Sequence, residues 1–277
     1  MNSSSNKERA FVDTTVLTDA LLKAGEPRDR AKQALEAFAE TLLPVYAIKE
    51  FQAGPLGDYC WIHNVFTNEQ SYSRAMQRVQ PVSRTPRRYL TSTSLEAIAV
   101  ATHAALGAMD TETARSKYGP DTTVDSLAAT EVRLKLHALI LRAWRKRRRI
   151  TTAVVDHLSC YDEIGPAEKR RLIVIKRRPC SLEPNCALAK LFREKPRDVQ
   201  ALMVTVKAQG EGPEHQRRYQ ALRALSRTAR PLNHKQCRVL GDAVFAFFAP
   251  ADATILTTNL KDHQPLAEAL GKSVVAP

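Results

Sequence analysis

The sequence lacks long apolar runs, since no stretch approaches the roughly 18 residues that a transmembrane helix needs. Glycine is scarce, at 10 of 277 residues, and neither a Gly-x-Gly-x-x-Gly nor a Walker A sequence occurs, so no nucleotide-binding loop is predicted. The absence of a Gly-x-Ser-x-Gly elbow argues against a serine hydrolase. Five cysteines, an odd number, suit a reducing compartment better than a disulfide scaffold. The first residues carry no apolar segment typical of a secretory signal. We therefore expect a soluble, cytoplasmic protein with no membrane partner.

Positive charge is concentrated in the middle of the chain. The whole sequence has 42 Lys and Arg against 29 Asp and Glu, a formal charge of +13. Residues 71–235 hold 32 of the basic and 15 of the acidic residues, whereas the two ends together are mildly acidic. A basic surface of this size attracts polyanions, because each neutralised phosphate releases a condensed counterion. The charge predicts a nucleic-acid partner, and the alternative is a solvated face with no partner.

Apolar patterning predicts an α/β protein with a mainly helical middle. Short apolar runs predict strands at 10–12, 42–46, 172–175, 254–257 and 273–275. The second of these is expected at a sheet edge, because Pro44 cannot donate to a ladder. Helical periodicity, caps and breakers predict helices at 19–24 (capped by Thr18), 27–41, 47–51, 94–108, 122–150, 187–192, 197–208, from 213 to 227, 236–248 and 261–270.

Four acidic or amide positions stand at the ends of these elements. Asp13 follows an apolar strand, Glu50 lies within an apolar helix, and Asp242 opens another. Asn259 follows the strand at 254–257, with Asp262 one helical turn later. A carboxylate within an apolar run is costly unless it is paired, and clustered carboxylates are commonly bridged by Mg²⁺ or Mn²⁺. Taken singly, each residue could equally be a cap, a turn former or a surface group.

In this order the segments resemble a PIN domain, a small α/β nuclease fold. Residues 10–17 resemble its opening strand and first acid, and residues 47–51 the helix that bears its second acid. Residues 241–262, with the third acid, a strand ending in Thr-x-Asn and a Lys-Asp pair, are the closest match. The resemblance implies a PIN-like parallel-sheet core flanked by helices. Residues 9–69 and 236–277 would form that core, and residues 70–235 a basic, mainly α-helical insertion.

The resemblance also implies an activity, namely Mg²⁺- or Mn²⁺-dependent hydrolysis of phosphodiester bonds, in RNA more often than in single-stranded DNA. Asp13, Glu50 and Asp242 would hold the metal, and Asn259 or Asp262 would complete the catalytic set. Asn259 departs from the acid that the family has at this position. This leaves open an inactive or weak PIN-like protein that binds nucleic acid or acts as a scaffold. A toxin or defence effector restrained or guided by a protein partner, and a homodimer, are further readings that the resemblance allows.

Two other groups of residues are candidates for binding. Basic clusters that would contact phosphate are Arg84, Arg87, Arg88, Arg145, Lys146, Arg147, Arg148, Arg149, Arg177 and Arg178. The alternative for each cluster is a solvated helix face or a helix end. A structural Zn²⁺ would use His157, Cys160, Cys180 and Cys186, although these cysteines could equally be small buried hydrophobes. The remaining histidines, including His263, lack metal-ligand spacing and are predicted to be surface or core groups.

Overall fold

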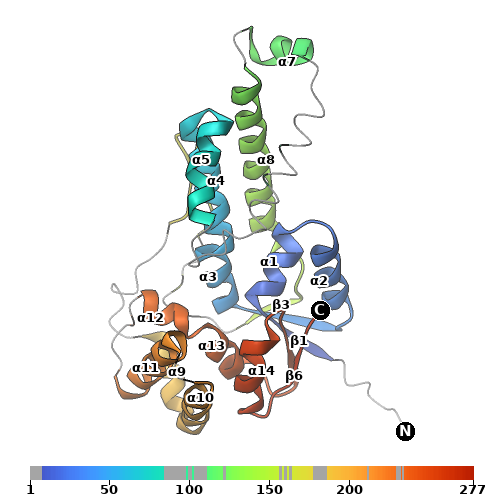
Figure 1. The fold of residues 1–277 in the computed structure, drawn as a ribbon. Helices are drawn as coiled ribbons and strands as arrows, with labels where there is room; N and C mark the ends of the chain where they lie inside the picture. The colour runs from blue at the N-terminus through green and yellow to red at the C-terminus, as the bar shows by residue number, and fades with distance from the viewer. Residues whose placement is uncertain are drawn as a thin grey trace, which may run out of the picture.

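The computed structural model describes residues 8–83, 98, 102, 111–120, 123–155, 158, 161, 164–176, 186–210, 212–228, 232 and 234–277. At its centre is a parallel five-stranded sheet in the order β3-β2-β1-β6-β7 (Figure 1). The strands are β1 Arg9–Val12, β2 Glu40–Pro44, β3 Ala153–Val155, β6 Ala253–Leu256 and β7 Val274–Val275. The predicted α/β class, with a parallel sheet flanked by helices, is confirmed.

Strand β1 lies in the middle of the sheet and is buried on both faces. Phe11 is fully buried and stands in register with Leu42 of β2 and Ile255 of β6. An apolar strand without alternation is typical of a parallel sheet covered on both sides. The chain leaves the sheet at Asp13, whose backbone N–H still donates to the carbonyl of Leu256 at 3.0 Å. This hydrogen bond to Leu256, the last residue of β6, fixes the backbone of Asp13 and therefore the position from which its side chain extends.

Helices cover both faces of this sheet. The helices α1 Thr14–Leu22 and α2 Glu26–Glu36 lie on one side of the strands in Figure 1, and α13 Gly241–Phe248 and α14 Leu260–Glu268 lie on the other. The α3 helix, Val45–Ala53, follows β2 directly. Asp13, and not Thr18, caps α1, because its carboxylate accepts the backbone N–H groups of Thr14 and Thr15. The helix therefore begins earlier than predicted.

A helical arm projects from the sheet in Figure 1. It consists of α4 Pro55–Glu69, α5 Tyr72–Ser83, α7 Thr111–Tyr118 and α8 Val124–Lys146. The helix predicted at 122–150 corresponds to α8, whose Val132, Leu136 and Ile140 are buried on one side. A hairpin of β4 Ala167–Lys169 and β5 Leu172–Val174 packs beside α4, where Asn64 exchanges two hydrogen bonds of 2.8 Å with the backbone of Ile173.

A second helical group lies against the carboxyl-terminal part of the core. It comprises α9 Ala187–Glu194, α10 Pro196–Ala208, α11 Pro213–Arg227 and α12 His234–Val239. Its apolar contact with the core includes Phe192 of α9 and Phe247 of α13, whose ring centroids are 4.3 Å apart. Of the described helices, none is long and apolar enough to cross a membrane.

Several predicted elements need correction. Strand β2 is not at an edge, because it pairs with both β1 and β3; Pro44 is its last residue, where a missing N–H is tolerated. The helix predicted at 236–248 is two helices that meet at Leu240. Most of the helix predicted at 94–108 lies outside the described residues. The stretch predicted as an insertion, 70–235, contributes β3 to the core sheet, so the chain does not divide cleanly there.

Candidate active site

The predicted acids meet at the carboxyl edge of the sheet. Asp13 directly follows β1, Thr257 directly follows β6, and α3, which carries Glu50, follows β2. Open α/β sheets bind ligands at this edge, where the loops after neighbouring strands converge. Strand order therefore brings together residues that are far apart in the sequence.

Asp13 is held rigidly by its neighbours. It is only 2% exposed, and its Oδ1 accepts the backbone N–H of Thr14 at 2.7 Å. Its Oδ2 accepts the hydroxyl of Thr15 at 2.5 Å and that of Thr257 at 2.8 Å. These bonds satisfy a buried carboxylate that would otherwise be expensive to keep in the interior.

Glu50 lies close to both Asp13 and Asp242. It accepts a 2.9 Å hydrogen bond from the hydroxyl of Thr14, the residue next to Asp13. It also lies against Gly241, where an added Cβ would stand 3.0 Å from Glu50 Oε1, so the glycine leaves room for the carboxylate. Burial and the nearby charges of Asp13 and Asp242 raise the pKa of Glu50 to about 8, although the Thr14 hydrogen bond opposes this. The three acids thus share one electrostatic environment.

Two cationic side chains lie against the acids. His263 of α14 is buried, with Nε2 3.1 Å from Oδ1 of Asp242 and 3.6 Å from Oδ2 of Asp13. Arg218 of α11 is also buried and donates to Asp242 Oδ2 at 2.5 Å and to the carbonyl of Val239 at 2.9 Å. Asp242 is therefore contacted by a cationic group on each of its two oxygens.

These contacts shift the pKa values of both partners. Burial alone would lower the pKa of His263, but the charge of Asp13 and the hydrogen bond and charge of Asp242 raise it to about 9. Burial would raise the pKa of Asp242, but the hydrogen bond from His263 and the charges of His263 and Arg218 lower it below its usual value. At neutral pH the imidazole is thus protonated and forms an ion pair with Asp242.

Asn259 and Asp262 lie beside this cluster and pair with each other. The side-chain amide of Asn259 donates to Asp262 Oδ2 at 2.9 Å, and its backbone N–H donates to Thr257 Oγ1 at 3.0 Å. Thr257 in turn donates to Asp13, so Asn259 reaches the acids through one hydroxyl. Asp262 is half-buried, and its described contact is with Asn259.

No family model, curated protein or solved structure matches this chain. The interpretation of the site therefore depends on its own residues.

The residues that sequence reasoning did not assign to the site are His263, Arg218, Thr14, Thr15 and Thr257. A signal for His263 existed, because it stands four residues after Asn259 and so falls on the same face of the helix that begins there. Arg218 carried no such signal, since its helix has several other arginines and only packing selects the one that turns inward.

The basic cluster at the end of α8 is only partly on the surface. Arg145, Lys146, Arg148 and Arg149 are exposed. Arg147 is buried, its guanidinium carbon lying 3.4 Å from the ring centroid of Trp144, and it also donates to the carbonyl of that residue. Its guanidinium is thus engaged in a cation–π contact and is not presented to solvent, so contact of Arg147 with phosphate stays an untested prediction. Arg84, Arg87, Arg88, Arg177 and Arg178 lie outside the described residues.

Three of the four residues predicted to bind Zn²⁺ also lie outside the described residues. His157, Cys160 and Cys180 lie among the residues that are not described, whereas Cys186 is half-buried and precedes α9 as its cap residue. Within the described part of the chain, no three Asp, Glu, His or Cys residues are arranged as a ready metal site. At the acidic cluster, His263 and Arg218 take up positions against the carboxylates.

Proposed function

We propose that this protein is a metal-dependent nuclease of the PIN-like type that hydrolyses phosphodiester bonds, in RNA rather than DNA. The observation that carries the proposal is the convergence of Asp13, Glu50 and Asp242, from three separate segments, at the carboxyl edge of a parallel sheet. Their order along the chain is the one that the PIN resemblance implies. A purely structural cluster would have little need for three carboxylates.

The donor set fits a hard divalent cation. Asp13, Glu50 and Asp242 offer carboxylate oxygens, which Mg²⁺ and Mn²⁺ prefer. Burial is the main cause of the raised pKa of Glu50, the charges of Asp13 and Asp242 add to it, and the charge of His263 opposes it. Such an ion, if bound by these carboxylates, would supply an activated water and would offset the negative charge that develops on the phosphate oxygens.

The remaining residues of the site have positioning roles. Thr15 and Thr257 fix the orientation of Asp13 through its Oδ2, and Thr14 does the same for Glu50. Gly241 lets the start of α13 approach Glu50 closely enough to bring Asp242 beside it. His263 and Arg218 hold Asp242 by its two oxygens, and so compete with a metal ion for that carboxylate.

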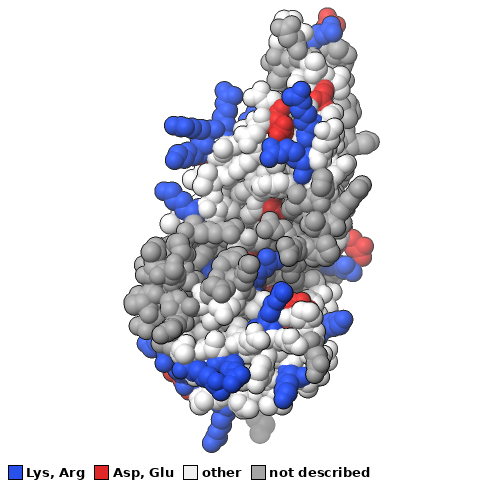
Figure 2. All heavy atoms as spheres, turned by 60° about the vertical axis from the view of Figure 1, so that its left-hand side comes forward, with Lys and Arg blue, Asp and Glu red and all other residues white. Residues whose placement is uncertain are grey.

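Basic side chains outnumber acidic ones on one face of the molecule, and a face of this kind attracts a polyanion. Figure 2 shows the face on which the helices at the left of Figure 1 come forward, and Lys and Arg dominate over Asp and Glu across it. These side chains would bind the backbone of a nucleic acid, which supplies affinity rather than sequence readout.

The direct test is cleavage of a fluorescently labelled single-stranded RNA with Mn²⁺ and with EDTA. We expect cleavage with Mn²⁺ and none with EDTA, and products that carry a 5′-phosphate. The Asp13→Asn and Asp242→Asn variants should lose cleavage and stay folded. Cleavage that survives in both variants would rule out this site.

A nucleic-acid-binding protein with a silent site is the second candidate. Two observations favour it, namely Asn259 in place of a fourth acid and the two cations already paired with Asp242. Binding of RNA without cleavage under any divalent ion would decide for this candidate.

A further inference from the structure

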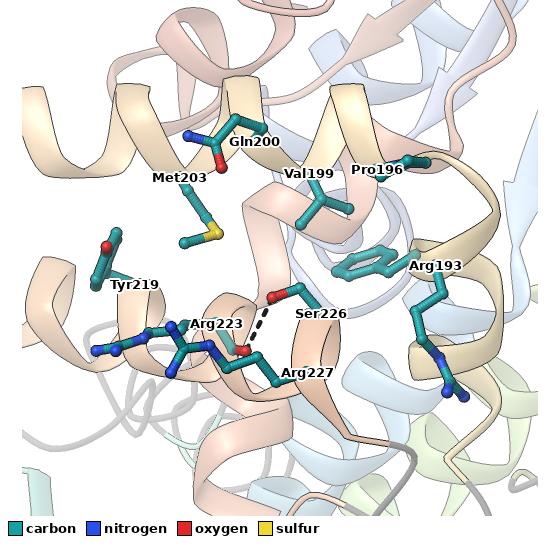
Figure 3. Close-up of a pocket in the computed structure, with 10 residues that line it drawn as sticks. Arg193, Pro196, Val199, Gln200, Met203, Tyr219, Arg223, Ser226 and Arg227 are labelled. Atoms are coloured by element: carbon teal, nitrogen blue, oxygen red, sulfur yellow. Dashed lines mark hydrogen bonds between the residues drawn. The ribbon is translucent and has the colours of Figure 1, made fainter.

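A cleft of about 700 Å³ lies between α9, α10 and α11, away from the acids themselves. Its volume is within the range of pockets that hold a small ligand. Figure 3 shows that Val199 and Met203 point from α10 into the space above α11, and that Tyr219 lies at one end. Val199 is buried, whereas Met203 and Tyr219 are half-exposed, so the cleft has an apolar surface that a flat ring could cover.

Arginine supplies all of the formal charge in this lining. Arg193, Arg223 and Arg227 line the cleft, and no Asp or Glu does so. All three are exposed, and Figure 3 shows Arg223 and Arg227 side by side, with their guanidinium groups extending towards Tyr219. The Nε of Arg193 donates a hydrogen bond to the carbonyl of Ala189. Among the described residues, neither Arg223 nor Arg227 has an acidic partner. This arrangement fits an anion.

A phosphate beside a flat apolar group is the chemistry of a nucleotide. Single-stranded nucleic acids are commonly bound by cations that follow the backbone and by aromatic side chains on which bases stack. We infer that this cleft binds one nucleotide of a single-stranded RNA, an inference that rests on the proposed function and names a second contact point for its substrate. Arg223 and Arg227 bind the phosphate, and Tyr219 and Met203 contact the base.

The cleft is linked to the acids through one helix. Arg218 and Tyr219 are neighbours on α11, and the first binds Asp242 while the second lines the cleft. A strand seated in the cleft is thus held by the same helix that positions Asp242.

The test is RNA binding by the full-length protein in EDTA, measured by the fluorescence anisotropy of a 5′-labelled single-stranded RNA. We expect the Arg223→Gln, Arg227→Gln double variant to bind at least tenfold more weakly than the wild type. The slope of log K against log salt should shrink by about 1.4, since each phosphate contact on a single strand contributes roughly 0.7. The Arg197→Gln, Arg217→Gln double variant is the matched control, because both arginines are exposed on α10 and α11 and neither lines the cleft.

Tyr219 separates base stacking from charge. Tyr219→Ala should weaken binding roughly tenfold, whereas Tyr219→Phe should retain it, because stacking needs only the ring. Circular dichroism and the melting temperature of each variant show that the fold is kept. Equal losses in the Arg197→Gln, Arg217→Gln control and in the cleft double variant would mean general charge attraction and would overturn the inference.

The outcomes separate this inference from the proposed function. If the Arg223→Gln, Arg227→Gln double variant binds and cleaves RNA like the wild type, the cleft inference fails and the nuclease proposal stands. If RNA binding depends on Arg223 and Arg227 but no divalent ion supports cleavage, the cleft inference stands and the nuclease proposal fails. Displacement of the RNA by polyglutamate at equal charge concentration would favour an acidic protein partner and overturn the inference.

Discussion

The imidazole Nε2 of His263 lies 3.1 Å from a carboxylate oxygen of Asp242, and this ion pair is buried at the edge of the sheet. His263 and Arg218 together offset the buried charges of Asp13 and Asp242, while the raised pKa of Glu50 keeps the third carboxyl group largely protonated near neutral pH. This balance of charges also determines how stability should depend on pH and on added metal ions.

The first prediction concerns pH. The pKa of His263 in the folded protein is about 9, above its ordinary 6.5, so its contribution to stability is complete below 6.5 and is lost as pH rises through 9. The pKa of Glu50, about 8 instead of 4.5, acts in the same direction, because the folded state holds a proton that the unfolded chain has released. We expect the melting temperature of the metal-free protein to fall by roughly 5 °C or more between pH 6 and pH 9. Differential scanning fluorimetry in EDTA measures this, and a flat profile would contradict the ion pair.

His263→Gln serves as the control for that experiment. The glutamine cannot gain a proton, so the decrease above pH 6.5 should become shallower while the part due to Glu50 remains. A profile identical to that of the wild type would show that His263 does not hold charge in the folded protein.

The second prediction concerns Arg218 and metal ions. Arg218→Gln leaves Asp242 with one cation fewer, so the metal-free variant should be destabilised by about 3 kcal/mol. A bound Mn²⁺ replaces the lost charge, so added Mn²⁺ should raise the melting temperature of this variant more than that of the wild type. Arg217→Gln, at the exposed neighbouring position, should respond like the wild type. An equal response of all three proteins to Mn²⁺ would count against metal binding at Asp242.

The prediction of these residues from sequence succeeded where local patterns were sufficient. Asp13 was found because it ends a short apolar strand, and Glu50 and Asp242 because they stand within apolar helices. The parallel sheet that unites them follows from strands alternating with helices. The placement of His263 and Arg218 depends on which face of α14 and α11 packs inward, and a single sequence with many basic residues does not show this.

The core sheet was only partly predictable for a related reason. The strand β3 is a run of only three apolar residues, all half-buried, directly after a basic helix end, and so short a run is a weak signal by itself. In the structure Asp13, and not the predicted Thr18, caps α1. The end of β1 places the Asp13 carboxylate next to two backbone N–H groups that have no partner within the helix. The place of β3 in the sheet and the start of α1 both depend on contacts between distant segments rather than on local propensity.

The third prediction concerns Thr257. Its hydroxyl donates to Asp13 at 2.8 Å, so Thr257→Val should remove one hydrogen bond to a buried carboxylate and cost about 2 kcal/mol in the free energy of unfolding. Thr258→Val, at the exposed next residue, should change it by less than about 0.5 kcal/mol. Urea denaturation of both variants makes the comparison. Equal stabilities would show that Asp13 does not depend on this hydroxyl.

The fourth prediction distinguishes two neighbouring arginines at the end of α8. Arg147→Ala removes the buried cation over Trp144 and should destabilise the protein by about 2 kcal/mol. Arg149→Ala, at an exposed position, should leave stability unchanged and weaken RNA binding equally for all sequences. Thermal melts and anisotropy titrations measure the two effects. The reverse pattern would mean that Arg147 is available to a ligand.

The central claim is that Asp13, Glu50 and Asp242 together bind a divalent ion. Isothermal titration calorimetry with Mn²⁺ on the wild type, Asp13→Asn and Asp242→Asn tests it without any nucleic acid. We expect saturable binding to the wild type with an affinity that falls at least tenfold in each variant, while the variants melt cooperatively. Binding to the wild type that both variants retain unchanged, or no saturable binding to the wild type at any pH between 6 and 9, would contradict it.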